Sequence, residues 1–128
     1  MSTTPNWTAV PRLGFAVPVI DADRTSAIVA VTTLLIGVAN GTRISRVDFQ
    51  HIVTNTACVV RLWWVSSGVK TLIRELALTP VTATTSVPGA LVTISFEPWG
   101  LILPSVNDIL ACSCSANTFN AIAHGGDL

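Results

Sequence analysis

The sequence predicts an all-β protein: a single-domain, jelly-roll-like antiparallel β-sandwich of about eight strands. β-Branched residues are abundant, turn signals recur at short intervals, and no segment combines a helical apolar period with end caps. Two packed sheets built from Greek keys are the usual architecture for about eight short strands. The 128 residues suffice for one domain with a sizeable core.

The chain divides into an arm and a domain. Residues 1–14 are polar and interrupted by prolines, which indicates an extended N-terminal arm, and residues 15–128 form the sandwich domain. The domain opens with a short edge strand over residues 15–20, because Pro18 cannot donate to a ladder.

The next two strands are expected at residues 24–37 and 43–53. The first is apolar on both strand faces, which favours a strand covered on both sides. Asn40-Gly41 between them is a strong hairpin signal. In the second strand the apolar residues change from even to odd positions, and a bulge near Ser45–Arg46 would reconcile the two phases.

A tryptophan pair stands in the following strand, "VVRLWWVSSG". Side chains alternate between the two faces of a strand. One face carries Cys58, Val60, Leu62 and Trp64, and the other carries Val59, Arg61, Trp63 and Val65. If Trp64 faces the core, Trp63 faces away from it. Residues 66–68 then form a tight hairpin into a strand over residues 69–79.

The last third of the chain alternates strands and turns. Residues 79–89 form a loop without core residues, and the next strand points Val92, Ile94 and Phe96 inward. A turn at residues 97–100 follows. The remaining strands are expected at residues 101–104, 108–114 and 119–124.

The composition indicates a surface that other subunits cover in part. Half of the residues are hydrophobic and only 11% are charged, against about 25% in an ordinary soluble domain. No apolar run reaches the roughly 18 residues that span a bilayer, so we expect no membrane partner. The net charge is zero without a basic run, so we expect no nucleic-acid partner.

Residues capable of catalysis are sparse, and neither an enzyme nor a cofactor or metal is expected. His51 and His124 lack a metal-binding spacing, and His51 is expected to be half-buried and hydrogen-bonded. Asp21 and Asp23 could contribute to a calcium loop, but a solvated turn is the simpler interpretation. Three cysteines without a secretory signal indicate free thiols in a reducing compartment. Two of them, Cys112 and Cys114, are either half of a metal site or small packed residues.

Several segments resemble a group of small virion proteins of tailed bacteriophages. The resembling segments are "NGTRISRV", "VVRLWWVSSGVKTLIRELAL" and "LVTISFEPWGLILPSVNDILACSCSANTFNAIAHGGDL", with "FNAIAHGGDL" the most specific. The resemblance covers residues 24–128. It implies a jelly-roll cement or decoration protein on the outer surface of an icosahedral phage head. Such a protein is made in the host cytoplasm, clamps major capsid subunits and acts without catalysis.

The expected contact residues are aromatic and basic, as in many interfaces. Trp63, Arg61 and Val59 are predicted to form an outer-face patch, Trp7 to anchor the arm, and Trp99 to act as a loop contact, toward the major capsid protein or in a dimer or trimer. Alternatively, each tryptophan is a packing residue under a loop. Two other functions stay open. They are a tail or fibre component that binds a receptor or glycan, and a cupin-like enzyme.

Overall fold

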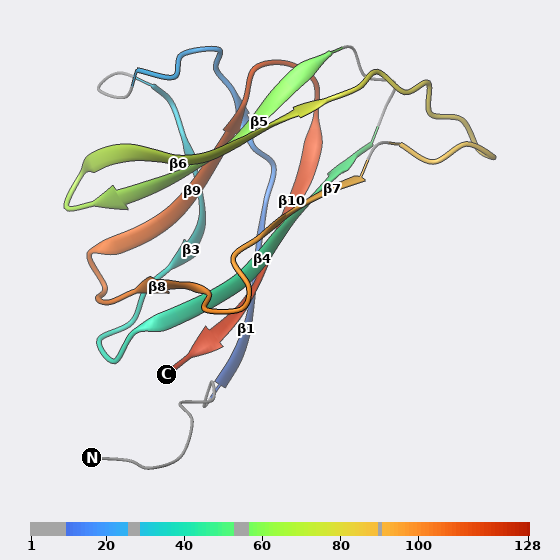
Figure 1. The fold of residues 1–128 in the computed structure, drawn as a ribbon. Coiled ribbons are helices and arrows are strands. Elements are labelled where there is room, and N and C mark those ends of the chain that lie inside the picture. The colour runs from blue at the N-terminus through green and yellow to red at the C-terminus, as the bar shows by residue number, and fades with distance from the viewer. Residues whose placement is uncertain (1–9, 26–28, 53–56, 90) are drawn as a thin grey trace.

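The computed structural model describes residues 10–25, 29–52, 57–89 and 91–128, which form ten strands and no helix. Two sheets pack face to face (Figure 1). Sheet A contains β1 (Val10–Ala16), β4 (Thr42–His51), β7 (Leu91–Ser95), β8 (Leu101–Leu103) and β10 (Phe119–Asp127). Sheet B contains β2 (Val19–Ile20), β3 (Thr32–Ile36), β5 (Cys58–Ser66), β6 (Val69–Leu78) and β9 (Asp108–Cys114). No helix of the described residues is long and apolar enough to cross a membrane.

The strand order is that of a jelly roll. Strands β7 and β8 both pair with β4, and β2 and β3 both pair with the same strand, β9, so the ten strands fill eight positions. Sheet A runs β1-β10-β4-β7/β8, and sheet B runs β2/β3-β9-β5-β6. The chain crosses between the sheets at most connections, as in two interlocked Greek keys. The predicted β-sandwich is therefore confirmed, although β2 pairs with β9 in parallel rather than antiparallel.

The main core lies between the sheets and is built from the inward faces of their central strands. β4 and β10 alternate buried and less buried residues, as half-covered strands do. β5 and β9 instead contain runs of consecutive buried residues, as strands covered on both faces do. The largest fully buried members of this core are Phe49, Phe119, Ile44, Leu62, Leu103 and Leu110. The inward positions of β7 are Val92 and Ile94, followed by Phe96, as predicted.

The predicted bulge in β4 is confirmed. The ladder pairs Arg46 with His124 and Ile44 with Gly125, so Ser45 has no partner residue in β10. The extra residue changes which positions face inward, because Ile44 before it and Val47 after it are both fully buried. The change of phase in the sequence was therefore the direct signal of this irregularity.

Sheet B carries a second, smaller core on its outer side. Trp63 of β5 and Ala111 of β9 lie there under Val29, and Val31, Val65 and Leu72 pack around them. Val29 and Val31 belong to the connection between β2 and β3, so the chain covers this side of the sheet itself. The Lys70 ammonium donates a 2.6 Å hydrogen bond to the carbonyl of Val29, which ties the connection to β6.

Three expectations about local structure are wrong. The arm predicted over residues 1–14 is wrong from residue 10 onward, because β1 begins at Val10 and pairs with β10 along its whole length. Asn40-Gly41 does form a turn, with Gly41 at φ +98°, but it joins sheet B to sheet A rather than two paired strands. The strand predicted over residues 24–37 is shorter, since β3 covers only Thr32–Ile36.

Candidate interaction surfaces

Trp63 is not a surface residue. Its side chain faces away from the main core, as the alternation predicted, but its exposed fraction is 0%. The indole N–H donates a 2.9 Å hydrogen bond to the hydroxyl of Ser113. The outward patch predicted around Trp63 is therefore wrong, because the chain's own β2–β3 connection covers this side of sheet B.

The two neighbours of Trp63 in the predicted patch are also largely covered. Arg61 is only 6% exposed, and its Nε lies 3.5 Å from a carboxylate oxygen of Glu75. Its guanidinium also approaches the carbonyl oxygen of Asp21 at 3.5 Å. Val59 is half-buried, and its backbone N–H donates to the hydroxyl of Ser115. These residues hold sheet B to the segments beside it.

Trp99 is the predicted contact residue that does lie on the surface. Its exposed fraction is 86%, the highest among the exposed large hydrophobic residues of the described chain. It stands in the turn between β7 and β8, at residues 97–100. The other predicted contact, Trp7, lies outside the described residues.

The turn that carries Trp99 is held by Arg43 of β4. The guanidinium lies 3.0 Å from the nearer carboxylate oxygen of Glu97 and donates hydrogen bonds to the carbonyls of Pro98 at 2.9 Å and Trp99 at 3.2 Å. Gly100 closes the turn at φ +78°, and its N–H donates to the Phe96 carbonyl at 2.7 Å. The backbone under Trp99 is thus fixed while its ring meets almost nothing.

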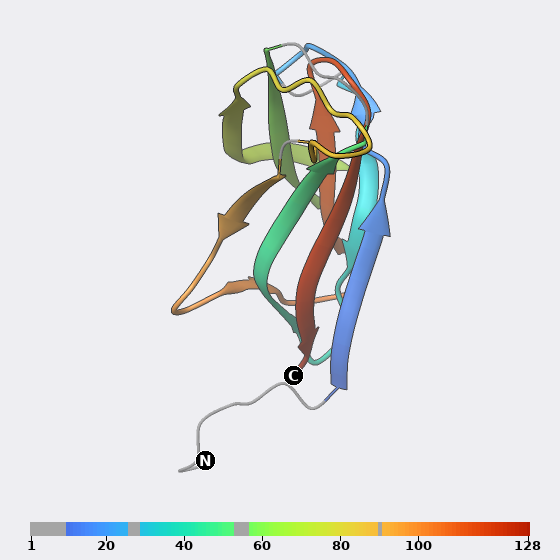
Figure 2. The same ribbon diagram turned by 90° about the vertical axis from the view of Figure 1, so that its right-hand side faces the viewer.

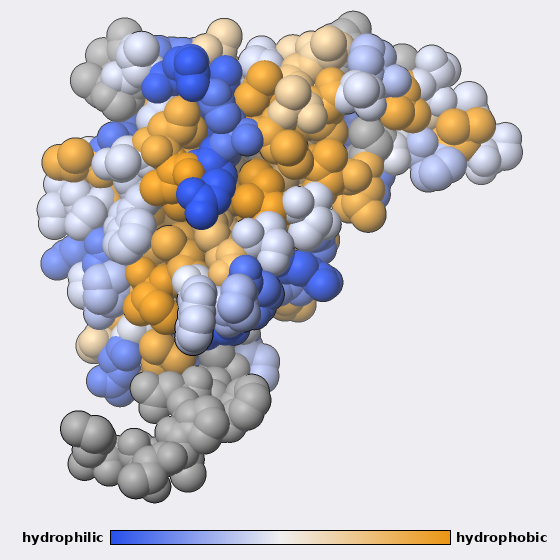
Figure 3. Space-filling model, viewed as in Figure 1, coloured by the Kyte–Doolittle hydropathy of each residue, from blue (hydrophilic) through white to orange (hydrophobic). Residues whose placement is uncertain are grey.

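An apolar opening lies beside Trp99, between β6 of sheet B and the β7–β8 side of sheet A. We call it the edge mouth. It is a hollow of about 440 Å³, and its apolar lining includes Trp64, Ile73, Phe96, Trp99 and Leu101. β6 is an edge strand of sheet B, and β7 and β8 form an edge of sheet A (Figure 2). Figure 3 looks onto this edge and shows apolar surface on both sides of a hydrophilic strip.

The residues of the edge mouth lie where the two sheets part, between β6 of sheet B and the β7–β8 side of sheet A. Trp64 faces the main core, as predicted, and its indole N–H donates to an Asp108 carboxylate oxygen at 2.9 Å. Hydrogen bonds from Trp64, Ser66 and Ser105 lower the pKa of Asp108. In β6, a register irregularity opposite Leu62 and Trp63 leaves Ile73 facing inward.

Arg74 is the cation of the edge mouth. Its guanidinium carbon lies 5.5 Å from the centre of the Phe96 ring, within the range of a cation–π contact. Every other arginine of the chain has a carboxylate within ion-pair distance, whereas Arg74 has none among the described residues. Glu97 also lines the mouth, but its carboxylate pairs with Arg43. The edge mouth therefore combines an apolar lining with a guanidinium that has no carboxylate of the described residues within ion-pair distance.

A second exposed apolar surface lies at the opposite edge of sheet A. Leu13 and Phe15 of β1, together with Val17 just after it, are each more than half exposed and alternate on one face. Ile122 of β10 pairs with Phe15 and extends this face inward. We call these four residues the apolar strip. β1 is an edge strand, and the strip contains no charged residue.

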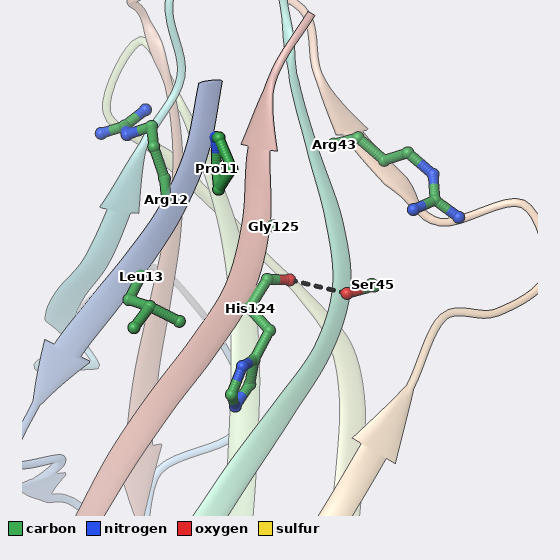
Figure 4. A pocket seen from close by; sticks show the side chains of 7 residues that line it. All are labelled: Pro11, Arg12, Leu13, Arg43, Ser45, His124 and Gly125. Atoms are coloured by element: carbon green, nitrogen blue, oxygen red, sulfur yellow. Dashed lines mark hydrogen bonds between the residues drawn. The ribbon is translucent and has the colours of Figure 1, made fainter. Parts of the chain in front are cut away.

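Another hollow, of about 610 Å³, lies at the bulge between β1, β10 and β4 (Figure 4). The Ser45 hydroxyl there donates to the carbonyl of His124 at 3.0 Å rather than to its imidazole. The imidazole Nε2 lies 3.0 Å from one carboxylate oxygen of Asp48, and the other oxygen accepts a hydrogen bond from the Thr93 hydroxyl. The Ser45 hydroxyl and the His124 imidazole therefore each have another partner and are not hydrogen-bonded to each other.

His51 and the cysteines Cys112 and Cys114 are buried inside the protein and do not line an exposed site. His51 is 1% exposed and not half-buried, and neither ring nitrogen has a partner among the described residues, contrary to the prediction. Cys112 and Cys114 are buried in the main core, and burial raises the pKa of Cys112 to about 12 and of Cys114 to about 11. In the described part of the chain, no three His, Cys, Asp or Glu side chains are grouped to hold a metal ion.

Comparisons with known proteins add no assignment. No protein-family model matches this chain, and no curated protein matches it in sequence.

The sequence segments "NGTRI" and "FNAIAHGGDL" have clear structural positions. The segment "FNAIAHGGDL" forms β10 in the interior of sheet A, and a side chain at Gly125 would overlap the Arg43 carbonyl. Asp127 at its end accepts hydrogen bonds from Arg12 and Thr42. The Arg-Ile pair of "NGTRI" places Ile44 in the core and Arg43 under the Trp99 turn. The motifs therefore describe how this sandwich is built.

Two surface features are not predicted by the sequence. The alternation of Leu13, Phe15 and Val17 is a strand signal, but the prolines and polar residues of positions 1–14 predict an arm, and the structure forms β1 there from Val10 onward. The edge mouth left no comparable signal. Trp64 and Ile73 look like ordinary core residues in sequence, and only the spacing between the two sheets leaves them accessible.

Proposed function

We propose that this chain is a non-enzymatic structural protein of a tailed-bacteriophage virion, which decorates the outer surface of the icosahedral head and cements it by clamping major capsid subunits. The observation that carries the proposal is the presence of two exposed apolar surfaces at opposite edges of one small sandwich. The apolar strip lies on β1, and the edge mouth with Trp99 lies beside β7 and β8. A protein that bridges two neighbours needs two separated contact surfaces.

The exposed apolar groups support a role in assembly. Phe15 is 66% exposed and Trp99 is 86% exposed, while only 11% of all residues are charged. Large exposed apolar patches on small proteins mark interaction sites. Permanent interfaces are larger and more hydrophobic than transient ones, and they suit a shell that remains assembled. The resemblance of residues 24–128 to phage virion proteins points to the same class.

The apolar strip suits a contact with the capsid surface. Leu13, Phe15 and Val17 project from one face of β1 and form a ridge rather than a pocket. Next to it, the outer side of sheet A carries Arg46 and Asp48, which form an ion pair at 3.4 Å. An apolar centre beside a polar margin is the usual composition of a protein–protein interface.

Locating the protein in purified virions tests the proposal. Cryo-electron microscopy should place its density on the outer head surface between capsomers. In virions assembled with Phe15→Ser, we expect less bound protein and earlier release of DNA on heating. The matched control is Val106→Ser, which removes an exposed apolar side chain outside both surfaces. Density only at the tail would support the receptor-binding alternative instead, and absence from the virion would refute both.

A further inference from the structure

We infer that the edge mouth is the binding site for Trp99 of a second copy of this chain. The two copies form a two-fold dimer in which each inserts its tryptophan into the mouth of the other. The inference rests on the proposed function in taking this edge as a contact surface, and it adds the identity of the partner.

The first argument is shape. Trp99 projects at the rim of the very hollow that it would fill in a partner, so a knob and a hole lie side by side on one surface. A surface with this arrangement is self-complementary, because a rotation by 180° places each knob over the other hole. The volume of about 440 Å³ lies within the roughly 300–1,000 Å³ of pockets that receive small organic groups. An indole ring therefore fits.

The second argument is the fixed backbone under Trp99. Arg43 binds the Glu97 carboxylate and the carbonyls of Pro98 and Trp99, so the turn does not have to become ordered on association. Preorganised contact residues reduce the entropy lost on binding. Above this fixed backbone, the Trp99 ring is 86% exposed and stands at the rim of the mouth.

The third argument is charge, and it selects a second copy over another partner. Arg74 lies at the mouth without a carboxylate partner among the described residues. Glu97 lies next to Trp99, and its side chain remains 48% exposed although it binds Arg43. When the two copies face each other, Glu97 arrives with Trp99 at the mouth that contains Arg74. The chain thus supplies both members of a charge pair, and two-fold symmetry produces the pair twice.

The dimer has a consequence for the proposed clamp. The edge mouth lies beside β7/β8, and the apolar strip lies on β1 at the far edge of sheet A. Association through the mouth therefore leaves one apolar strip free on each copy. A dimer of this kind presents two identical strips at its two ends, one for each of two neighbouring capsid subunits.

The test is the mass of the full chain in solution, measured by sedimentation equilibrium over micromolar concentrations. We expect a dimer, and we expect Trp99→Ser to raise the dissociation constant at least about 30-fold, because a buried interface tryptophan commonly contributes that much. The matched control Phe15→Ser removes an exposed aromatic side chain from the opposite edge and should leave the dissociation constant unchanged.

A second pair of variants tests the charge argument. Arg74→Glu places a negative charge opposite Glu97 of the partner and should weaken the dimer about 10-fold or more, since like charges in an interface repel. Arg46→Glu reverses the charge of an arginine on the outer side of sheet A and should leave the dimer intact. Thermal unfolding of each variant verifies that it is folded.

The outcomes separate the two proposals. A wild-type monomer at all concentrations, or a Trp99→Ser variant that dimerises like the wild type, overturns the dimer. The protein could instead be monomeric and occupy the head surface, with Trp99→Ser abolishing its binding to the head. In that case the edge mouth binds the capsid, and only the dimer is refuted. If the protein dimerises through Trp99 but is absent from virions, the dimer stands and the proposed function is refuted.

Discussion

The indole N–H of Trp63 in β5 donates a 2.9 Å hydrogen bond to the hydroxyl of Ser113 in β9, on the side of sheet B that faces away from the main core. Both side chains are fully buried. The bond lies under the connection between β2 and β3, which supplies Val29 as a cover. The sandwich therefore has a third layer over part of sheet B, and that layer accounts for an apolar residue that alternation alone would place in solvent.

Trp63 should contribute to stability rather than to binding. Trp63→Ala removes a buried indole and its hydrogen bond, so we expect the free energy of unfolding to fall by about 3–5 kcal/mol in urea denaturation. The matched control is Trp99→Ala, which should change it by less than about 0.5 kcal/mol in the monomer because that ring is exposed. If Trp63→Ala does not fold, Trp63→Phe serves instead. Equal midpoints for Trp63→Phe and the wild type would contradict the third layer.

Two glycines with left-handed backbones give a test of the Trp99 turn. At Gly68, φ is +83° and an added Cβ would meet nothing within 4 Å. Gly68→Ala should therefore lower the free energy of unfolding by only about 1–2 kcal/mol, the cost of a left-handed backbone at a residue with a side chain. At Gly100, φ is +78° and the Cβ would lie 2.7 Å from Nε of Arg43. Gly100→Ala should therefore lose more stability than Gly68→Ala and increase the mobility of Trp99 in fluorescence anisotropy. Equal losses would show that Arg43 does not hold the turn.

The cysteine thiols should be unreactive in the folded protein. Burial raises the pKa of Cys112 to about 12 and of Cys114 to about 11, so almost no thiolate forms at pH 8. Thiolate is the nucleophile toward a disulfide reagent. We expect the reagent to titrate these thiols only after denaturation, when all three cysteines of the chain react. Rapid reaction of the folded protein would show that the main core opens easily.

Most of the fold follows from local pattern. Alternation in β5 identified its two faces, and the phase change at Ser45 identified the bulge, because both depend on residues that are neighbours in sequence. The error at residues 10–14 has a different cause. Pro11 and the polar residues before it suggest an arm, but β10 offers seven consecutive ladder partners, and tertiary pairing overrides local preference.

The surface could be predicted only in part. Exposure of Trp99 followed from its place in a Pro-Gly turn, whereas the burial of Trp63 depends on where the β2–β3 connection passes. That path is a long-range property without a periodic signal in sequence. The edge mouth is similar, since it depends on how far apart β6 and the β7–β8 turn lie. Sequence alternation reports which face a residue occupies and not what covers that face.

The burial of His51 predicts a loss of stability in mild acid. The ring lies 4.8 Å from the Phe119 ring in an edge-on contact, and its nitrogens have no partner among the described residues. Burial lowers the pKa of His51 below its ordinary value of 6.5, because the charged form is poorly solvated. His51 therefore takes up a proton more readily in the unfolded chain than in the folded chain. As a result, the free energy of unfolding is highest above about pH 7.5 and falls as the pH drops below about 6.5.

The carboxylates act in a separate pH range and do not obscure this effect. Hydrogen bonds lower the pKa values of Asp21, Asp23 and Asp108 from 3.8. The contributions of these carboxylates to the free energy of unfolding are therefore lost only at a more acidic pH than the range in which His51 acts. Urea denaturation between pH 5 and pH 8 should show the decrease in the wild type and a flatter profile in His51→Leu. The control His124→Gln, which changes a partly exposed histidine, should keep the decrease. A wild-type profile that is flat between pH 8 and pH 5 would show that His51 accepts a proton without opening the core.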